Sequence, residues 1–358
     1  MVGARFLAVA LVAFCACSND DGPIEPPPGG PTRTWRMGFS AIPPHFNPDE
    51  ARATIDLWSQ RGDAAILHVS PPWAALLAGT NAVAAVTGNE LPLATYYRSK
   101  NLEVVVMVDA TDGLNRAAEA PELAQLGRSI SEPAVQQVYR QFVLAISSIV
   151  RPDYLGLAAE VNLIRLQAPP SLYASLVQMV NASENDLRTS LSTAKRYVSV
   201  QVDVAWGRAG QNNVYQGVEK DFTDFPFIQA LGLSSYPYFV FADPDEVPLD
   251  YYSRLPNGRT LPVMVVEGGW TSATLGGGIV SSPEKQARYI RRQARMLDSA
   301  HAHAAFQLTF TDLDMASPGL PPGTNLSFFA SLGLVDTQLR PKPALAVWDS
   351  LFAVRRFP

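Results

Sequence analysis

Two glutamates stand where apolar runs of the sequence end, and paired carboxyl groups are suited to acid–base and nucleophilic chemistry. Glu160 follows the run 154–159, and Glu267 follows the run 263–266. A carboxylate beside a hydrophobic core is costly unless it has a partner or a function. One such glutamate is explained equally well as a helix cap or an ion-pair partner. Two of them predict a reacting pair, in which one carboxyl group donates a proton while an ionised one attacks.

The elements that would position this pair are short apolar runs separated by helical patterns. The runs are continuous rather than alternating, as in strands that are buried on both faces. They cover residues 37–42, 64–69, 102–108, 154–159, 197–204, 231–235, 263–266 and 304–310. Helices are expected over residues 48–61, 131–149, 171–193, 282–300 and 343–354, most of them opened by Ser or by Pro with an acidic residue.

Strand–helix alternation through eight runs predicts a single (β/α)8 TIM barrel. A doubly wound open sheet is the alternative. It is disfavoured because no Gly-x-Gly-x-x-Gly follows the first run and no phosphate-binding lysine loop is present. Chemistry in a barrel lies at the carboxyl ends of the strands. Glu160 would end the fourth strand and Glu267 the seventh.

Three stretches of the chain resemble glycoside hydrolase clan A and, within it, family 53, the endo-β-1,4-galactanases. Residues 231–238, Leu-Gly-Leu-Ser-Ser-Tyr-Pro-Tyr, resemble that family's sixth-strand motif, and residues 262–270 resemble its nucleophile strand. The segments 332–336 and 340–344 resemble a common ending of the clan. The resemblance extends over residues 35–355.

The resemblance implies a barrel enzyme in which Glu160 is the general acid/base and Glu267 is the nucleophile. Tyr236 would hydrogen-bond Glu267 and keep it ionised. A retaining glycosidase needs its two carboxyl groups about 5–5.5 Å apart. Opposite strands of one barrel would set that gap.

Three positions depart from the pattern of the clan. Ala159 precedes Glu160 where the clan has Asn, His68 lies near the second-strand position of an Arg, and Gln307 opens the eighth-strand stretch that usually ends in Trp. Asn162 lies two residues beyond Glu160. We expect His68, Asn162 and Gln307 to contact substrate.

Further residues at strand ends are candidates for lining a sugar cleft. Trp73, Trp206 and Trp270 follow three of the runs and have the aromatic faces that stack on sugar rings. Packing at the rim of the barrel is the alternative for Trp73 and Trp206, whereas the position of Trp270 after Glu267 favours the cleft. Asp109 ends the third strand and Asp203 lies in the fifth; each would bind a hydroxyl group or form an ion pair.

Other kinds of site have little support. With 28 Lys and Arg against 33 Asp and Glu, the net charge of −5 and the absence of basic clusters argue against nucleic-acid binding. His301 and His303 have a metal-pair spacing but precede the eighth strand, at the wrong end of the barrel, so no metal is expected. No Gly-x-Ser-x-Gly elbow is present. No organic cofactor and no association motif is indicated, which leaves the oligomeric state open.

The beginning of the chain has the features of an export signal. Arg5 precedes a short apolar stretch, 6–14, and the small residue Ala16 precedes Cys17, as in a bacterial lipobox. We therefore expect a signal peptide over 1–17 with lipidation at Cys17, a Pro/Gly-rich tether over 18–34, and a catalytic domain over 35–358. Plain secretion is the alternative to a lipid-anchored protein of the cell envelope. Both cysteines lie in the signal, so the domain has neither a disulfide nor a thiol nucleophile.

These observations predict a retaining glycoside hydrolase that acts on a polysaccharide or oligosaccharide, with galactan suggested by the resemblance alone. The alternative is a non-catalytic carbohydrate-binding lipoprotein built on the same barrel. The departures at Ala159 and Gln307 favour this alternative. Retention of Glu160, Glu267 and Tyr236 favours the enzyme.

Overall fold

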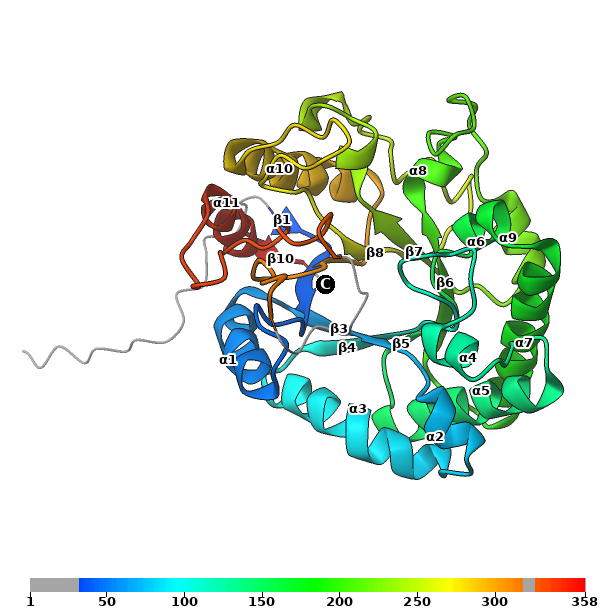
Figure 1. The fold of residues 1–358 in the computed structure, drawn as a ribbon. Coiled ribbons are helices and arrows are strands. Elements are labelled where there is room, and N and C mark those ends of the chain that lie inside the picture. Colours follow the sequence, from blue (N-terminus) through cyan, green and yellow to red (C-terminus); the bar gives the residue numbers. More distant parts are fainter. Residues whose placement is uncertain (1–31, 318–325, 358) are drawn as a thin grey trace, which may run out of the picture. The chain divides into compact units, whose positions relative to one another are not determined.

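Eight parallel strands close into one barrel in the computed structural model, which describes residues 32–317 and 326–357 (Figure 1). The barrel order follows the chain order, with β9 closing on β2. The strands are β2 (Arg36–Ser40), β3 (Ala64–Val69), β4 (Glu103–Val108), β5 (Tyr154–Gly156), β6 (Lys195–Gln201), β7 (Ala230–Ser235), β8 (Val263–Gly268) and β9 (Ala304–Gln307). The predicted (β/α)8 barrel is confirmed.

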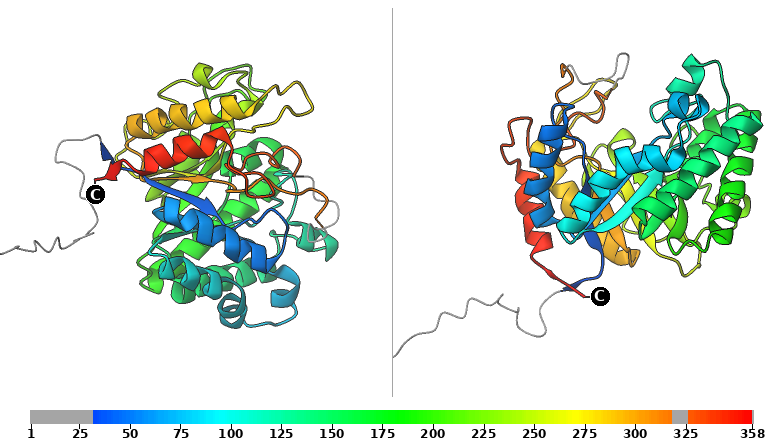
Figure 2. Two further views of the ribbon diagram at one scale, coloured as in Figure 1. Left: turned by 90° about the vertical axis from the view of Figure 1, so that its left-hand side faces the viewer. Right: turned by 90° about the horizontal axis from the view of Figure 1, so that it is seen from below.

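Helices surround the barrel, as Figures 1 and 2 show. They are α1 (Pro48–Trp58), α2 (Trp73–Leu77), α3 (Ala82–Ser99), α4 (Pro121–Gln125), α5 (Pro133–Ala145), α6 (Val161–Gln167), α7 (Pro170–Thr189), α8 (Val202–Ala205), α9 (Glu219–Asp224), α10 (Pro283–Ser299) and α11 (Pro343–Phe352). Short turns of helix extend or connect them: η1 (Ser59–Arg61), η2 (Ile146–Val150), η3 (Pro237–Phe239) and η4 (Pro244–Glu246). Among the described residues, no helix is long and apolar enough to cross a membrane.

The helix starts follow from local chemistry. Asn47 accepts a hydrogen bond from the Glu50 amide at the start of α1, and Ser282 accepts one from the Lys285 amide at the start of α10. Proline occupies the first turn of both helices, where its missing N–H costs nothing. The five expected helices are therefore found close to their expected bounds.

Helix α3 is the main element that the sequence pattern does not predict. It contains Gly88 and Pro92, and its apolar residues do not gather on one face. Pro92 has no N–H to donate to the carbonyl of Gly88, four residues earlier. Packing of Val86, Ala94 and Tyr97 against the core stabilises the helix in spite of this.

Three expected strands end three residues before their apolar runs do. β5 ends at Gly156, β9 ends at Gln307, and β6 ends at Gln201, where the chain turns into α8. Asp203 therefore lies on α8 and not in a strand, which corrects the expectation. Gln201 causes the turn, because its side chain accepts a hydrogen bond from the Val204 amide.

The amino-terminal face of the barrel carries a small second sheet. β1 (Thr32–Arg33) pairs in parallel with β10 (Arg355–Arg356), and Arg33 forms an ion pair with Asp63 at 2.6 Å. The folded unit thus begins at Thr32, three residues before the expected boundary. The expected signal peptide, Cys17 and most of the tether lie outside the described residues.

Candidate active site

Glu160 and Glu267 meet at the carboxyl ends of the strands, as the barrel predicts. Both line a cleft of about 500 Å³, together with Arg116, Tyr236 and Asp203. Glu160 stands between β5 and α6, and Glu267 is the second-last residue of β8. The cleft is therefore the candidate active site.

A serine joins the two glutamates. The Ser234 hydroxyl, on β7, lies 2.5 Å from Glu160 Oε1 and 2.8 Å from Glu267 Oε1. The sum of these two lengths limits the separation of the two carboxylate oxygens to 5.3 Å. Ser234 belongs to the sixth-strand motif, but nothing in the spacing of that motif identifies it as a bridge.

Glu160 is held in a strained and buried position. Its φ of 48° lies in the left-handed region, which costs a non-glycine residue about 1 kcal/mol or more. Its amide donates to Ser199 Oγ at 2.9 Å, and its side chain accepts from Arg116 Nε at 2.8 Å. Backbone strain of this kind is often stored at functional sites.

Arg116, like Ser234, is a residue of the site that sequence reasoning missed. It lies on the loop between β4 and α4 and is 4% exposed. Its guanidinium donates to both oxygens of Asp109, at 2.8 and 2.7 Å, as well as to Glu160. Asp109 therefore forms an ion pair, which was one of the two roles expected for it. No periodic pattern covers the loop, so its sequence contains no signal that would have identified Arg116.

The charge of Glu267 is poorly compensated. Burial raises the pKa of Glu267 to about 7, the negative charge of Glu160 adds to the shift, and Arg116 opposes it. The carboxylate lies 3.7 Å from His68 Nε2, on β3. Burial lowers the pKa of His68 to about 4, so the imidazole is neutral at pH 7. His68 is therefore placed beside Glu267 but does not supply the positive charge of an Arg.

Tyr236 lies beside Glu267 in this cleft, and its expected role in keeping Glu267 ionised stays a prediction. Burial, followed by the negative charge of Glu267, raises the pKa of the Tyr236 phenol well above its usual value. The phenol therefore keeps its proton and can act only as a neutral hydrogen-bond donor or acceptor. Burial likewise raises the pKa of Asp203 to about 6.

The remaining candidates do not line the cleft that holds both glutamates. Trp73 is 1% exposed and stacks on Tyr139, and Trp206 donates to the Tyr251 carbonyl at 2.9 Å. These contacts correspond to the rim-packing alternative. Trp270 is 1% exposed and lines a neighbouring pocket of about 270 Å³ with Tyr238.

Asn162 and Gln307 are also engaged by the protein. Asn162 exchanges two hydrogen bonds with the backbone of Gln201, at 2.9 and 2.8 Å, and so connects α6 to β6. Gln307 donates to Gln293 Oε1 at 2.8 Å. Both side chains are 1% exposed, so neither reaches a sugar in this conformation. Their roles in substrate binding stay predictions.

Metal binding finds no support in residues 32–317 and 326–357, where no three His, Cys, Asp or Glu side chains are grouped to hold an ion. His303 instead pairs with Glu103 at 2.8 Å at the amino-terminal end of the barrel.

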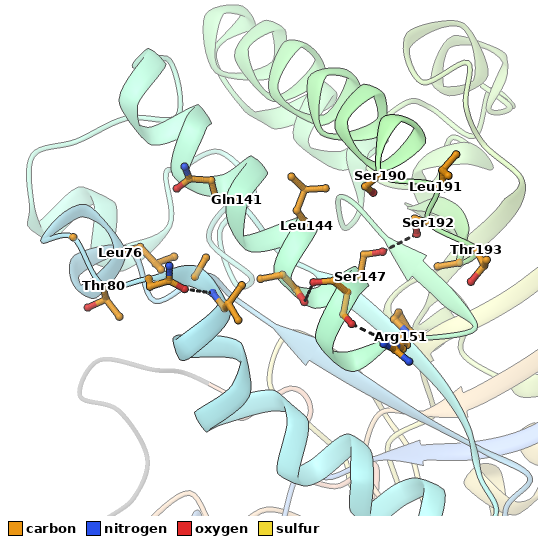
Figure 3. A pocket seen from close by; sticks show the side chains of 18 residues that line it. Leu76, Thr80, Gln141, Leu144, Ser147, Arg151, Ser190, Leu191, Ser192 and Thr193 are labelled. Atoms are coloured by element: carbon orange, nitrogen blue, oxygen red, sulfur yellow. Dashed lines mark hydrogen bonds between the residues drawn. The ribbon is translucent and has the colours of Figure 1, made fainter.

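A larger pocket, of about 870 Å³, lies apart from the glutamates (Figure 3). It is formed by the α2–α3 connection, the end of α5 and the loop before β6, and includes Thr80, Ser147 and Ser192. Ser147 and Ser192 hydrogen-bond each other at 2.7 Å, and no residue of the candidate site lines this pocket.

Comparison with known proteins shows similarity of structure only. No family model matches the sequence, and no curated protein matches it. The exo-β-1,4-mannosidase Op5Man5 from Opitutaceae bacterium strain TAV5 has a TM-score of 0.67 and 16% identity over 90% of this chain, which spans 59% of that protein. A family 53 catalytic domain from Ignisphaera aggregans has a TM-score of 0.61 and 16% identity, over 92% of this chain and 99% of that one.

A third similar structure is a family 5 subfamily 18 protein from Bifidobacterium longum in complex with Manβ1-4GlcNAc. Its TM-score is 0.58 at 14% identity, over 90% of this chain and 80% of that one. Family 53 is thus among the structural neighbours, as the sequence resemblance implies. The chain has the (β/α)8 fold that these glycoside hydrolases share.

Proposed function

We propose that this protein is a retaining glycoside hydrolase with Glu160 and Glu267 as its reacting pair. The observation that carries the proposal is the Ser234 bridge, which keeps the two carboxylate oxygens within 5.3 Å. Retaining enzymes place their carboxyl groups about 5–5.5 Å apart, whereas inverting enzymes leave about 6.5–9.5 Å for a water molecule. The structural neighbours, which are glycoside hydrolases, support the same class.

Each residue has a defined role in this mechanism. Glu160 protonates the glycosidic oxygen while ionised Glu267 attacks the anomeric carbon, which gives a covalent glycosyl-enzyme. Glu160 then takes a proton from water, and the resulting hydroxide displaces Glu267. The neutral Tyr236 phenol orients Glu267 without adding charge to the cleft.

The substrate class that we propose is a β-linked oligosaccharide or polysaccharide. The mannosidase among the neighbours and the complex with Manβ1-4GlcNAc make β-mannosides the first compounds to screen. The resemblance to family 53 and the neighbour from that family add β-1,4-galactan.

The experiment is a hydrolysis screen with wild type, Glu267→Gln and Glu160→Gln. 4-Nitrophenyl β-mannoside, 4-nitrophenyl β-galactoside, mannan and β-1,4-galactan are the substrates. We expect Glu267→Gln to lose turnover while its circular dichroism stays native. Proton NMR of the first product should show the anomer of the substrate. Wild-type rates in Glu267→Gln, or an inverted first product, would refute the retaining assignment.

Non-catalytic carbohydrate binding is the second candidate, and the Arg116–Glu160 ion pair favours it. A carboxylate held by a buried guanidinium is a poor proton donor. Titration calorimetry with the same oligosaccharides separates the two functions. Heat of binding without any released sugar in wild type would favour a binding protein.

We also propose that the mature protein is a lipid-anchored protein of the bacterial cell envelope. The lipobox-like Ala16-Cys17 pair supports this proposal. Metabolic labelling with an alkyne fatty acid should mark the wild type and not Cys17→Ser. Labelling of both proteins would exclude anchoring at Cys17.

A further inference from the structure

The hydrogen bonds at Ser234 require one proton more than the serine has. Its hydroxyl has a single hydrogen to donate, yet it lies within hydrogen-bond distance of Oε1 of both Glu160 and Glu267. If both carboxyl groups were ionised, one of these contacts would join two acceptors. One carboxyl group therefore holds a proton and donates it to Ser234 Oγ, while Ser234 donates to the other.

Arg116 determines which of the two carboxyl groups is ionised. Its Nε donates to Glu160 Oε2 at 2.8 Å, and both side chains are nearly sealed from water. Glu267 has no such partner, since its closest basic neighbour is the neutral His68. The Nε2 of that imidazole is 3.2 Å from the Val266 carbonyl, to which it can donate. The negative charge therefore belongs on Glu160 and the proton on Glu267.

The surrounding groups are consistent with this distribution. Other titratable or charged side chains face the pair from β3, β6 and α8 and from the residues that follow β4 and β7. They are His68, Asp109, Tyr197, Tyr236 and Asp203. None of these five is a cation at pH 7, because His68 and both tyrosines are neutral there and the remaining two are acids. Arg208 also lines the cleft, and its positive charge acts on Asp203. Asp109 and Glu160 already share the positive charge of Arg116, so ionisation of Glu267 as well would add a further uncompensated negative charge.

We propose that Ser234 is a proton relay between the two glutamates, and that Arg116 holds the resting proton on Glu267. This inference rests on the proposed function, in which Glu160 must hold the proton when the glycosidic bond breaks. In the relay, the Glu267 carboxyl group gives its proton to Ser234 Oγ, and the Ser234 hydroxyl proton moves to Glu160 Oε1. Glu267 becomes a carboxylate and Glu160 an acid, with no proton gained or lost.

The substrate supplies the reason for the transfer. Positive charge develops at the anomeric carbon in the transition state of a glycosidase. That carbon lies against Glu267, so its charge stabilises the ionised form of this residue and draws the proton toward Glu160. Ser234 carries the proton between the two reacting carboxyl groups in this account. In the resting site Glu267 is protonated, so it becomes a nucleophile only after the proton has moved to Glu160.

The resting proton is tested without any substrate. Carboxyl-carbon NMR on protein labelled with [δ-¹³C]glutamate resolves the two residues, and Glu160→Gln and Glu267→Gln assign the signals. We expect the Glu267 signal to titrate near pH 7 in the wild type, while the Glu160 signal keeps its carboxylate position there. Titration of Glu160 near pH 7 in place of Glu267, or of neither residue above about pH 5, would overturn the proposal.

Variants of the bridge test the relay itself. Ser234→Ala removes the hydroxyl, Ser234→Thr keeps it, and Ser235→Ala is the matched control, since Ser235 bonds Tyr252 and not the glutamates. In Ser234→Ala we expect kcat on the unactivated glycoside to fall at least about tenfold, with KM little changed and the rate restored in Ser234→Thr.

The possible outcomes separate this inference from the proposed function. Unchanged kcat in Ser234→Ala, or an equal loss in Ser235→Ala, would refute the relay. The expected NMR titration without cleavage of any glycoside would refute the hydrolase and the relay together, and leave the resting proton on Glu267 as found. Arg116→Lys retains a cation at the site and should leave the proton on Glu267. Transfer of the proton to Glu160 in this variant would contradict the role of Arg116.

Discussion

His68 faces Glu267 across 3.7 Å, between Nε2 and Oε2, and does so as a neutral imidazole. Its Nδ1 is buried and has no partner among the described residues, while Nε2 faces the carbonyl of Val266. The cation of this site comes instead from Arg116, which pairs with Glu160 on the other side of Ser234. The positive charge of Arg116 thus lies against Glu160, whereas the neutral His68 lies against Glu267.

Stability should fall when His68 has to accept a proton. Burial lowers the pKa of His68 in the folded protein to about 4, against 6.5 when it is exposed. The unfolded chain therefore binds the proton first as the pH falls. The contribution of the neutral ring is full above about pH 6.5 and is lost toward pH 4. Urea unfolding should show wild type losing up to about 3 kcal/mol relative to His68→Gln between pH 7 and 4.5. A constant difference would contradict the buried neutral ring.

Glu267 should lower the free energy of unfolding at alkaline pH. Its pKa in the folded protein is raised to about 7 from the usual 4.5, so folding favours its protonated form. That advantage is full below about pH 4.5 and is lost as the pH rises through 7. We expect Glu267→Gln to be more stable than wild type at pH 8.5, by roughly 1–3 kcal/mol, with a smaller difference at pH 5. Chemical denaturation at both values checks the sign, and a less stable variant at pH 8.5 would be inconsistent with it.

Asp109 should matter for the stability of the folded protein. Asp109→Asn removes the charge that holds the Arg116 guanidinium at 2.8 and 2.7 Å. Breaking a buried ion pair from one side costs about 3 kcal/mol. Glu219→Gln is the control, because its ion pair with Arg259 is exposed and should contribute less than about 1 kcal/mol. Equal losses in the two variants, measured by urea unfolding, would argue against a special role for the buried pair.

Trp348 should anchor the last helix to the barrel. It is 2% exposed, lies 4.6 Å from the Phe39 ring and donates to the Arg61 carbonyl at 2.9 Å. Trp348→Ala should reduce the free energy of unfolding by about 3–5 kcal/mol, because the cavity cannot close around a rigid barrel strand. Leu191→Ala, at a residue that is 85% exposed, should change it by less than about 0.5 kcal/mol. A small effect of Trp348→Ala would show that α11 docks independently of this ring.

The strands could be predicted because a parallel barrel buries both of their faces. Residues 64–69 and 263–266 are continuous apolar runs, and both were found as strands with their ends within two residues of the expectation. The position of Glu267 near the end of β8 followed directly from the run 263–266, whereas β5 ends at Gly156 and Glu160 begins α6. Helix α3 could not be predicted, because packing and not periodicity stabilises it.

The contacts inside the cleft could not be predicted from spacing. Arg116 comes from an irregular loop, and whether it reaches Glu160 or solvent depends on tertiary packing. Ser234 lies in a strand that is buried throughout, where a serine is expected to bond the backbone. For the tryptophans, residue type alone suggested contact with sugar. Trp73 and Trp270 are instead buried against Tyr139 and Tyr289, contacts that the sequence does not reveal.

The pairing of β1 with β10 has a consequence for how the molecule can be attached to other things. Thr32 and Arg355 are neighbours on the face of the barrel away from Glu160 and Glu267. In Figure 2 the end of the chain lies beside the first described residues. A surface, fusion partner or bead joined ahead of Thr32 therefore leaves from the rear of the molecule. A long polymer chain could therefore enter the cleft without passing Thr32.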